Sequence, residues 1–385
     1  MTLFPRLALA GIVASVCAFG ASAELPNDEL TVFPMPPANP ERIYLADPVM
    51  PHLVDGRVHV IDGVAMKVLG MLGTGFASQF SLSPDRSEIY VATTYHSRLQ
   101  RGPRTDVLEV YDASNLDFKY EIELPPKHVQ GLNIRAAQAS TPDGRWLLIQ
   151  NATPATSVTV VDVVQRKVAA EIATPGCYGI VPWPGNPRRF SAVCGDGTLS
   201  TIDLKDDGSL AGRTVSARFF DPDQDPVFMQ YEFVGEKIYL VSYHGQVHGV
   251  QLSGAAPAFD APWPLVPEAE RKQGWAPGGY ELFAIRPDGR RLYIGMHRHA
   301  KEGSHKNPAE QLWVYDLASH QRIARAPGQG AISMKVSRSE APRLVLLDGE
   351  HNELKALDVR DDKHLGKPVA TFANAGETPV YLELH

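Results

Sequence analysis

The chain has 385 residues, of which 44% are hydrophobic and 21% charged, and its formal net charge at pH 7 is −7. This composition is typical of a globular protein and excludes an intrinsically disordered one. Basic residues are nowhere concentrated as they are on nucleic-acid-binding surfaces, so we expect no nucleic-acid partner.

The first 23 residues have the pattern of a secretory signal peptide. A single basic residue, Arg6, precedes the apolar run LALAGIVASVCAFG, and the small residues Ala21-Ser22-Ala23 follow it. The run is too short to span a bilayer, and no later segment is apolar enough to do so. We therefore expect a signal peptide over 1–23, an N-terminal extension over 24–40, and export of the mature protein to the periplasm without membrane insertion.

An apolar strand that ends in an acidic turn recurs along the chain at intervals of about fifty residues. A degenerate copy ends at Ser253, and the other copies end at Asp62, Asp112, Asp162, Asp203, Asp316 and Asp358. Each copy lies in a group of short strands that are rich in β-branched and aromatic residues and separated by Pro, Asp, Asn and Gly turns. Four-stranded antiparallel units at this period predict an all-β fold, a seven-bladed β-propeller over residues 41–385. The alternative is an open two-domain β-sandwich.

The two ends of the chain are expected to share one blade. The first unit has only three predicted strands, in RIYLAD, RVHVID and MKVLGML, whereas PVYLELH at 379–385 is a strand left over after the seventh unit. Pairing the C-terminal strand with the N-terminal blade removes the exposed edge of an open ring. Deleting residues 379–385 should then destabilise the whole protein.

Two cysteines, Cys177 and Cys194, follow the signal peptide. They lie at the far ends of two predicted strands, and the midpoint between them falls in the turn Pro184-Gly185-Asn186-Pro187. Residues placed in this way face each other across an antiparallel hairpin, at a distance that a disulfide spans. Because an exported chain encounters oxidising conditions, we predict a structural disulfide.

Few residues suggest that the chain catalyses a reaction by itself. A histidine-rich segment, MHRHAKEGSHK, allows a metal site, but its Lys, Gly and Ser content favours a solvated loop; its histidines are His297, His299 and His305. A calcium-like spacing in FFDPDQDP lacks the glycine and distal glutamate of an EF-hand loop; its acidic residues are Asp221, Asp223 and Asp225. Motifs of serine hydrolases, zinc proteases and nucleotide-binding loops are absent. We expect no metal and no catalytic residue in this chain.

Two long connections depart from the repeat, over residues 93–106 and 268–285. Loops on a rigid scaffold are common docking sites, and aromatic and arginine residues are enriched at such contacts. We therefore select four candidate contacts to a partner: Arg101, Arg104, Trp275 and Tyr280. For Trp275 the alternative is that it covers the end of the core.

Several long segments resemble the large (heavy) subunit of the quinoprotein amine dehydrogenases, and the aromatic amine branch more than the methylamine branch. The resemblance extends from about Glu41 to the C-terminus and is carried by RIYLAD…HL…RVHV (42–60), TTYHSRLQRGPRTDVLEVYDA (93–113), LPPKHVQGLN (124–133), QNATPATSVTVVDV (150–163), WAPGGYEL (275–282) and KEGSHKNPAEQLWVYD (301–316). It implies the same seven-bladed propeller and places the family's intra-chain disulfide on Cys177 and Cys194.

This resemblance implies an exported α2β2 enzyme that oxidatively deaminates primary amines to aldehydes and ammonia. Electrons would pass to a type I copper protein such as azurin or amicyanin. The family's catalyst, tryptophan tryptophylquinone, is formed on the small subunit, so this chain would hold no cofactor and would be inactive alone.

The channel-lining phenylalanine of the family matches Phe76 in LGTGFAS, on the expected loop into the second blade. The resemblance implies that Phe76 narrows the mouth of the substrate channel at the small-subunit interface; the alternative is a packing role alone. Two other classes of function compete with this interpretation. One is a stand-alone exported propeller that binds a ligand or protein without a quinone partner. The other is a propeller enzyme that uses its own central-channel residues or a metal.

Overall fold

The computed structural model describes residues 34–131, 133–362 and 365–385, so the predicted signal peptide 1–23 lies outside the described residues. Residues Met35–His385 form one compact unit. Helix is confined within the described residues to α1 (Glu268–Arg271) and the 3-10 turns η1 (Met50–Asp55), η2 (Arg135–Ala137) and η3 (Ser304–Lys306). None of the helices in this part of the chain has the length and apolar character needed to cross a membrane.

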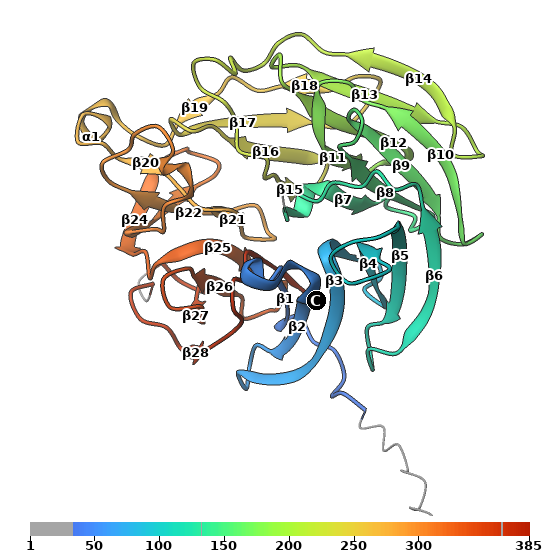
Figure 1. Cartoon of the computed structure of the whole chain (residues 1–385). Coiled ribbons are helices and arrows are strands. Elements are labelled where there is room, and N and C mark those ends of the chain that lie inside the picture. Colours follow the sequence, from blue (N-terminus) through green and yellow to red (C-terminus); the bar gives the residue numbers. More distant parts are fainter. Residues whose placement is uncertain (1–33, 132, 363–364) are drawn as a thin grey trace, which may run out of the picture. The chain divides into compact units, whose positions relative to one another are not determined.

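The strands form six antiparallel sheets (Figure 1). The first sheet has seven strands in the order β29 (Tyr381–Leu384), β1 (Arg42–Asp47), β2 (Gly56–Asp62), β3 (Lys67–Leu82), β4 (Glu88–His96), β5 (Arg104–Asp112) and β6 (Phe118–Leu124). The second comprises β7 (Gln138–Ser140), β8 (Trp146–Asn151), β9 (Ser157–Asp162) and β10 (Lys167–Ala173), and the third β11 (Cys177–Trp183), β12 (Asn186–Cys194), β13 (Leu199–Leu204) and β14 (Leu210–Val215).

Three further sheets complete the chain. The fourth comprises β15 (Glu232–Val234), β16 (Lys237–Val241), β17 (Gln246–Gln251) and β18 (Ala258–Phe259), with β19 (Trp263–Pro264) also on β17. The fifth comprises β20 (Ala276–Pro277), β22 (Arg291–His297), β23 (Gln311–Asp316) and β24 (Arg322–Pro327), with β21 (Phe283–Ile285) also on β22. The sixth comprises β25 (Ala331–Val336), β26 (Arg343–Asp348), β27 (Glu353–Asp358) and β28 (Ala370–Phe372).

The seven-stranded sheet consists of two four-stranded units that share β3. The first part of this 16-residue strand pairs with β2 and the last part with β4. Strand β29 pairs antiparallel with β1, with Ile43 opposite Leu384, so the C-terminal strand completes the N-terminal unit as predicted. The described chain therefore contains six sheets, or seven four-stranded units when the long sheet is divided at β3.

The repeated acidic strand is the third strand of each unit. Its aspartate ends the strand because the carboxylate accepts hydrogen bonds from backbone amides of the following turn, as Asp62 does from Val64 at 2.8 Å and Asp112 from Ser114 at 2.7 Å. The same contact recurs in three further units, from Gln165 to Asp162, Ser319 to Asp316 and Arg360 to Asp358. The motif thus sets the hairpin that leads to the fourth strand.

The core comprises seven clusters of buried apolar side chains that each lie between two successive units, and an eighth, small cluster around the disulfide within one unit. One cluster joins Ile43 of the N-terminal unit to Val345 of the β25–β28 sheet, and another joins Tyr44 to Phe80 of the next unit. Alternate side chains of β1 therefore pack on opposite neighbours. Every unit has a neighbour on both sides, which agrees with a propeller and not with an open sandwich.

The disulfide prediction is confirmed. Cys177 and Cys194 are directly opposed in the β11–β12 pair, with their Cα atoms 3.9 Å apart, and their sulfurs are bonded.

Candidate functional site

The residues selected from the sequence gather at one end of the Met35–His385 unit. Phe76 begins the part of β3 that pairs with β4, Arg104 is the first residue of β5, and Tyr280 precedes β21. The first strand of each unit starts at this end, and the loop between the second and third strands returns there. We call it the Phe76 face.

Phe76 lies within β3 and not on a loop, which corrects the sequence-based expectation. It pairs with Thr94 where β3 passes from one four-stranded unit to the next. The glycines of LGTGFAS suggested a loop, but they serve a kink inside the strand, since Gly75 has φ 64° and Ala77 has φ 50°. The half-buried Phe76 ring meets the ring of His96 edge-on, with centroids 6.0 Å apart.

The connection expected over 93–106 is shorter than predicted. Strand β4 continues to His96 and β5 begins at Arg104, so only residues 97–103 form the loop. Arg101 is exposed on this loop. Arg104 is half-buried, and its guanidinium donates two hydrogen bonds of 2.6 Å to the buried carboxylate of Asp106.

A buried polar network surrounds Asp106 beneath the Phe76 face. The Asp106 carboxylate also accepts hydrogen bonds from Thr94 Oγ1 at 2.8 Å and His128 Nδ1 at 2.9 Å. Burial alone would raise the pKa of Asp106, but the hydrogen bonds from His128 and Arg104 outweigh burial and hold that pKa well below its usual range. Asp106 is therefore an ionised, fully paired group. The sequence did not reveal this network because its members come from different strands and loops.

Trp275 fills the end of the core, which was the alternative considered for it. Its side chain is 3% exposed and packs against Trp313 with ring centroids 5.4 Å apart, and Arg298 lies over its outer side. The segment 268–285 is only partly a loop, since it contains α1, β20 and β21. Tyr280, by contrast, is 37% exposed and remains a candidate contact, with the Lys306 ammonium 5.3 Å from its ring.

The three histidines of MHRHAKEGSHK do not converge on a metal site. His297 is buried at the end of β22, His299 is exposed, and His305 stacks on Tyr243 with centroids 4.8 Å apart. Only His299 and His305 therefore belong to the predicted solvated loop. The Asp221 carboxylate accepts a hydrogen bond from the backbone amide of Asp223 and so stabilises a turn.

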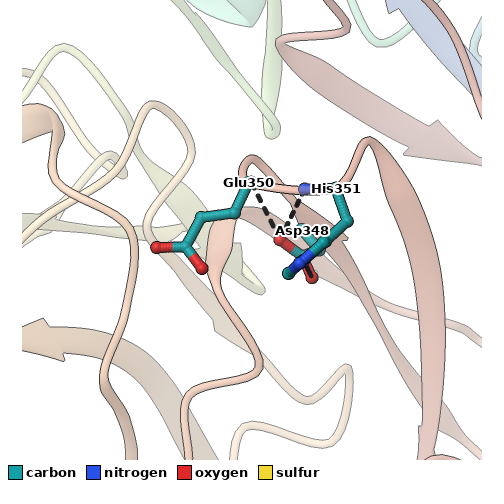
Figure 2. A group of neighbouring side chains, drawn as sticks. All are labelled: Asp348, Glu350 and His351. Atoms are coloured by element: carbon teal, nitrogen blue, oxygen red, sulfur yellow. Dashed lines mark hydrogen bonds and ion pairs between the residues drawn. The ribbon is translucent and has the colours of Figure 1, made fainter.

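The described residues bring together one group with metal-ligand chemistry, Asp348, Glu350 and His351 (Figure 2). The Asp348 carboxylate is already occupied, because it accepts from His351 Nδ1 at 2.9 Å, from Lys355 Nζ at 2.5 Å and from the Glu350 amide at 2.9 Å. Burial would raise the pKa of Asp348, yet the Lys355 and His351 hydrogen bonds lower it. The Lys355 ammonium forms an ion pair with this carboxylate and occupies the place that a metal ion would need. The group therefore stabilises a turn.

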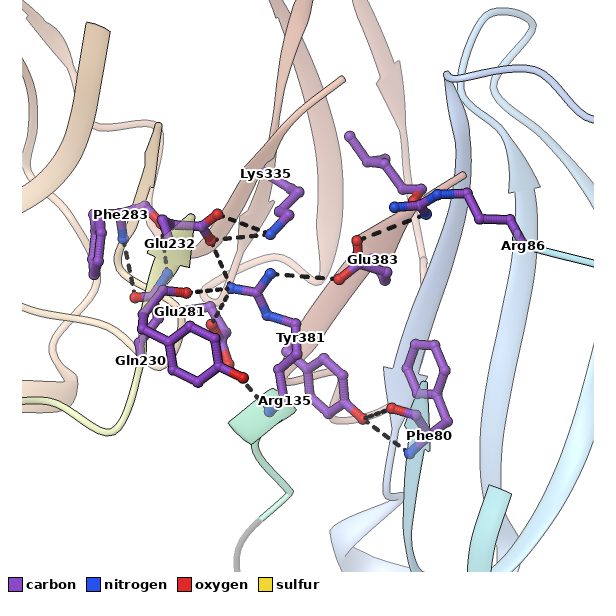
Figure 3. Close-up of polar contacts among 12 residues, drawn as sticks. Phe80, Arg86, Arg135, Gln230, Glu232, Glu281, Phe283, Lys335, Tyr381 and Glu383 are labelled. Carbon is purple, nitrogen blue, oxygen red and sulfur yellow. Dashed lines mark hydrogen bonds and ion pairs between the residues drawn. The ribbon is translucent and has the colours of Figure 1, made fainter. Parts of the chain in front are cut away.

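A cavity of about 540 Å³ lies among the first strands of the units, and its lining reaches the turns at the end opposite the Phe76 face. At its wall the Arg135 guanidinium meets three glutamates from separate units (Figure 3): Glu232 at 2.6 Å, Glu281 at 3.2 Å and Glu383 at 3.4 Å. Lys335 Nζ also lies 3.0 Å from the Glu232 carboxylate.

The charges of this central cluster depend on one another, since two cations, Arg135 and Lys335, face three glutamates. Burial would lower the pKa of Arg135, but the surrounding glutamates raise it well above its usual value. Burial raises the pKa of Glu232 to about 7 against the opposing effect of Arg135, so its charge depends on that arginine. The sequence signal was present but weak: charged residues interrupt the first strands in YLEL, SMKV and YEFV.

Comparisons with known proteins identify the family. Residues 39–380 match the model of the methylamine dehydrogenase heavy chain. The methylamine dehydrogenase heavy chain of Methylobacillus flagellatus is 28% identical over 360 residues, covering 92% of this chain and 88% of its own length. That of Methylorubrum extorquens is 28% identical over 375 residues, covering 96% of this chain and 88% of its own.

A solved structure supports the fold alone. The β-propeller domain of Cps50 (Swd1) from Myceliophteria thermophila superposes with a TM-score of 0.54 over 83% of this chain and 90% of that domain, at 10% identity. The sequence match is therefore what carries identity: this chain belongs to the methylamine dehydrogenase heavy-chain family, the heavy subunits of amine dehydrogenases.

Proposed function

We propose that this chain is the large subunit of a periplasmic α2β2 quinoprotein amine dehydrogenase that converts primary, aromatic amines to aldehydes and ammonia. The observation that carries the proposal is the family match over residues 39–380, together with an aromatic ring, Phe76, set on a kinked strand at one end of the fold. Electrons would leave to a type I copper protein such as azurin or amicyanin. The fold is taken as a seven-bladed propeller over 41–385, preceded by a signal peptide over 1–23 and an extension over 24–40.

The reactive quinone, tryptophan tryptophylquinone, would belong to the small subunit and supply the oxidising chemistry. The tryptophans of this chain support that division. Its one described Trp–Trp contact, between Trp275 and Trp313, is buried, with exposed fractions of 3% and 0%. Arg322 lies over Trp313, 4.4 Å from its ring, so an amine substrate has no access to the pair.

This chain would bind the small subunit and shape the substrate channel. Apolar side chains stand exposed at the Phe76 face, among them Tyr95 (40% exposed) near the end of β4 and Leu99 (74% exposed) on the loop that follows. Exposed apolar and aromatic side chains around a site are typical of a protein interface. Phe76 would form one wall of the channel mouth and exclude water from the amine that passes it.

A second candidate is a stand-alone exported propeller that binds a small ligand. The central cavity of about 540 Å³, with charged groups in its wall, favours it because ligand sites are typically concave spaces of this size with a few polar groups. In that case the Phe76 face would need no quinone-bearing partner.

Purification from the native source under mild conditions separates these functions. The proposal predicts that the chain elutes with a small, cysteine-rich subunit and with quinone absorbance. A colourless single chain would favour the ligand-binding propeller, and metal-dependent amine oxidation by the single chain would indicate a self-sufficient enzyme.

A further inference from the structure

The kink that carries Phe76 leaves part of β3 outside the strand ladder. Phe76 pairs with Thr94, and the next pair is Gln79 with Ala92, so Ala77 and Ser78 fall between ladder pairs. Both neighbours of Phe76 have left-handed backbone angles, and Ala77 is not a glycine. A non-glycine residue in this conformation is strained and is held only by its surroundings.

Side chains from the β6–β7 connection hold the two carbonyl groups of this kink. His128 Nε2 lies 3.5 Å from the Ala77 carbonyl oxygen, and Asn133 Nδ2 donates to the Ser78 carbonyl at 2.5 Å. Because a carbonyl oxygen only accepts, His128 acts here as a donor through Nε2. The backbone on the C-terminal side of Phe76 is therefore held by His128 and Asn133, whose side chains lie outside the strand pairing of β3.

The orientation of His128 is itself fixed. The ring is 1% exposed, its Nδ1 lies 2.9 Å from Asp106 Oδ2, and its backbone nitrogen donates to the same oxygen at 3.3 Å. Arg104 closes the arrangement by donating to both the Asp106 carboxylate and the His128 carbonyl, the latter at 3.3 Å. Because Asp106 and Arg104 hold the His128 ring in place, its Nε2 cannot move with the Ala77 carbonyl. A shift of Ala77 would therefore break this contact.

We propose that His128, held by Asp106, is a positioning residue that fixes the kink under Phe76 and thereby the aromatic wall at the channel mouth. The proposal rests on the proposed function, in which Phe76 lines that channel. The proposal goes beyond that function because it makes amine selectivity depend on the buried pair of His128 and Asp106, which does not contact the substrate.

Two substitutions separate the two contacts of His128. The amide nitrogen of asparagine can take the place of Nδ1, so His128→Asn keeps the bond to Asp106 and loses the donor toward Ala77. The amide nitrogen of glutamine reaches the place of Nε2, so His128→Gln keeps the donor toward Ala77. The readout is the ratio of kcat/KM for 2-phenylethylamine to kcat/KM for methylamine in the assembled enzyme. We expect His128→Asn to move the logarithm of this ratio at least halfway from the wild-type value to the value of Phe76→Ala. His128→Gln should stay within about threefold of wild type.

Hydrogen exchange of the full chain gives a readout that does not depend on the quinone. The amides of residues 76–79 should exchange at least about tenfold faster in His128→Asn than in wild type, with His128→Gln in between. If His128→Asn fails to fold, Asn133→Ala, which removes the other tether, should show the same faster exchange and the same direction of selectivity change.

The outcomes distinguish the two proposals. The positioning role would be overturned if Phe76→Ala altered the selectivity while His128→Asn and Asn133→Ala kept wild-type selectivity and wild-type hydrogen exchange. That result would leave the proposed function intact. If Phe76→Ala itself left the ratio unchanged, the channel role of Phe76 would be wrong, and the positioning role would fall with it.

Discussion

Phe76 is held in a way that an ordinary strand residue is not. Its neighbours Gly75 and Ala77 both have positive φ, and a Cβ added at Gly75 would lie 2.7 Å from Thr93 Oγ1. The kink therefore requires glycine at 75 and turns the ring of Phe76 toward His96 at the end of the unit. A ring presented on a fixed backbone selects ligands by shape better than one on a mobile loop.

Replacing Phe76 with alanine should widen the channel mouth and shift the selectivity of the enzyme toward bulkier amines. A pocket contact of this size is worth about 1–3 kcal/mol, so we expect the ratio of kcat/KM for 2-phenylethylamine over methylamine to change by roughly 10–200-fold in the assembled enzyme. Phe118→Ala is the matched control, because Phe118 is 55% exposed on β6, away from the kink, and its loss should leave the ratio unchanged. An unchanged ratio in Phe76→Ala would refute the channel role.

The candidate contacts show which side-chain roles the sequence reveals. Composition identified the segments at the Phe76 face, but it could not distinguish exposed from engaged side chains. Arg101 and Tyr280 are exposed, whereas Arg104 is bound to Asp106 and Trp275 lies in the core. The difference depends on partners across strands, which a linear pattern does not specify.

At the level of elements, strand β29 joins the two ends of the chain. It pairs with β1 over Tyr381–Leu384, and Leu382 and Leu384 belong to the cluster between the N-terminal unit and the β25–β28 sheet. The Tyr381 hydroxyl accepts a hydrogen bond at 3.2 Å from the amide of Phe80, which lies in the neighbouring unit on the other side. One short strand thus contributes to two neighbouring cores.

Deleting residues 379–385 should lower the free energy of unfolding by more than about 5 kcal/mol, because two buried leucines and one buried tyrosine are lost and each large buried side chain contributes about 2–5 kcal/mol. Chemical denaturation measures the change. Deleting His385 alone removes no ladder pair and should cost far less. A 379–385 deletion as stable as wild type would show that β29 does not close the fold.

The strands were largely predictable because the repeat supplied its own alignment. All seven copies of the repeated strand are third strands, and in five units the aspartate accepts a hydrogen bond from a backbone amide of the turn that follows. The Phe76 segment was misassigned because glycines usually signal loops, whereas here they let one strand change partners. Local sequence patterns predict hairpins. They do not show that one strand is shared by two units, because such sharing depends on tertiary packing.

At the level of the whole molecule, Arg135 links units that are remote in sequence. It lies between Glu232, Glu281 and Glu383, which come from the β15–β18 sheet, the segment before β21, and β29. No motif could have predicted this cluster, because its members are 97 or more residues from Arg135. Removing the arginine would leave two buried carboxylates, Glu232 and Glu281, and the partly buried Glu383, with Lys335 beside Glu232 and Arg86 beside Glu383 as the remaining cations.

Arg135→Met should therefore lower the free energy of unfolding by about 3–5 kcal/mol near pH 8. The exposed pair of Arg188 with Asp206 supplies the control, and Arg188→Met should cost less than about 1 kcal/mol.

The folded-state pKa of Glu232, already raised to about 7, would rise further without Arg135, while its pKa in the unfolded state stays at about 4.3. Protonation then favours the folded variant, so its deficit should shrink as the pH falls from 8 toward 5. A deficit that is absent, or that grows over that range, would contradict this account of the cluster.

The central claim is that this chain is a scaffold that shapes a channel toward a quinone held by its partner. The most direct test is to add 2-phenylethylamine, without oxygen, to the purified complex and to this chain separated from the small subunit. We expect the complex to show quinone absorbance that the amine bleaches, and the separated chain to show neither absorbance nor amine oxidation. Amine oxidation by the separated chain alone would contradict the account.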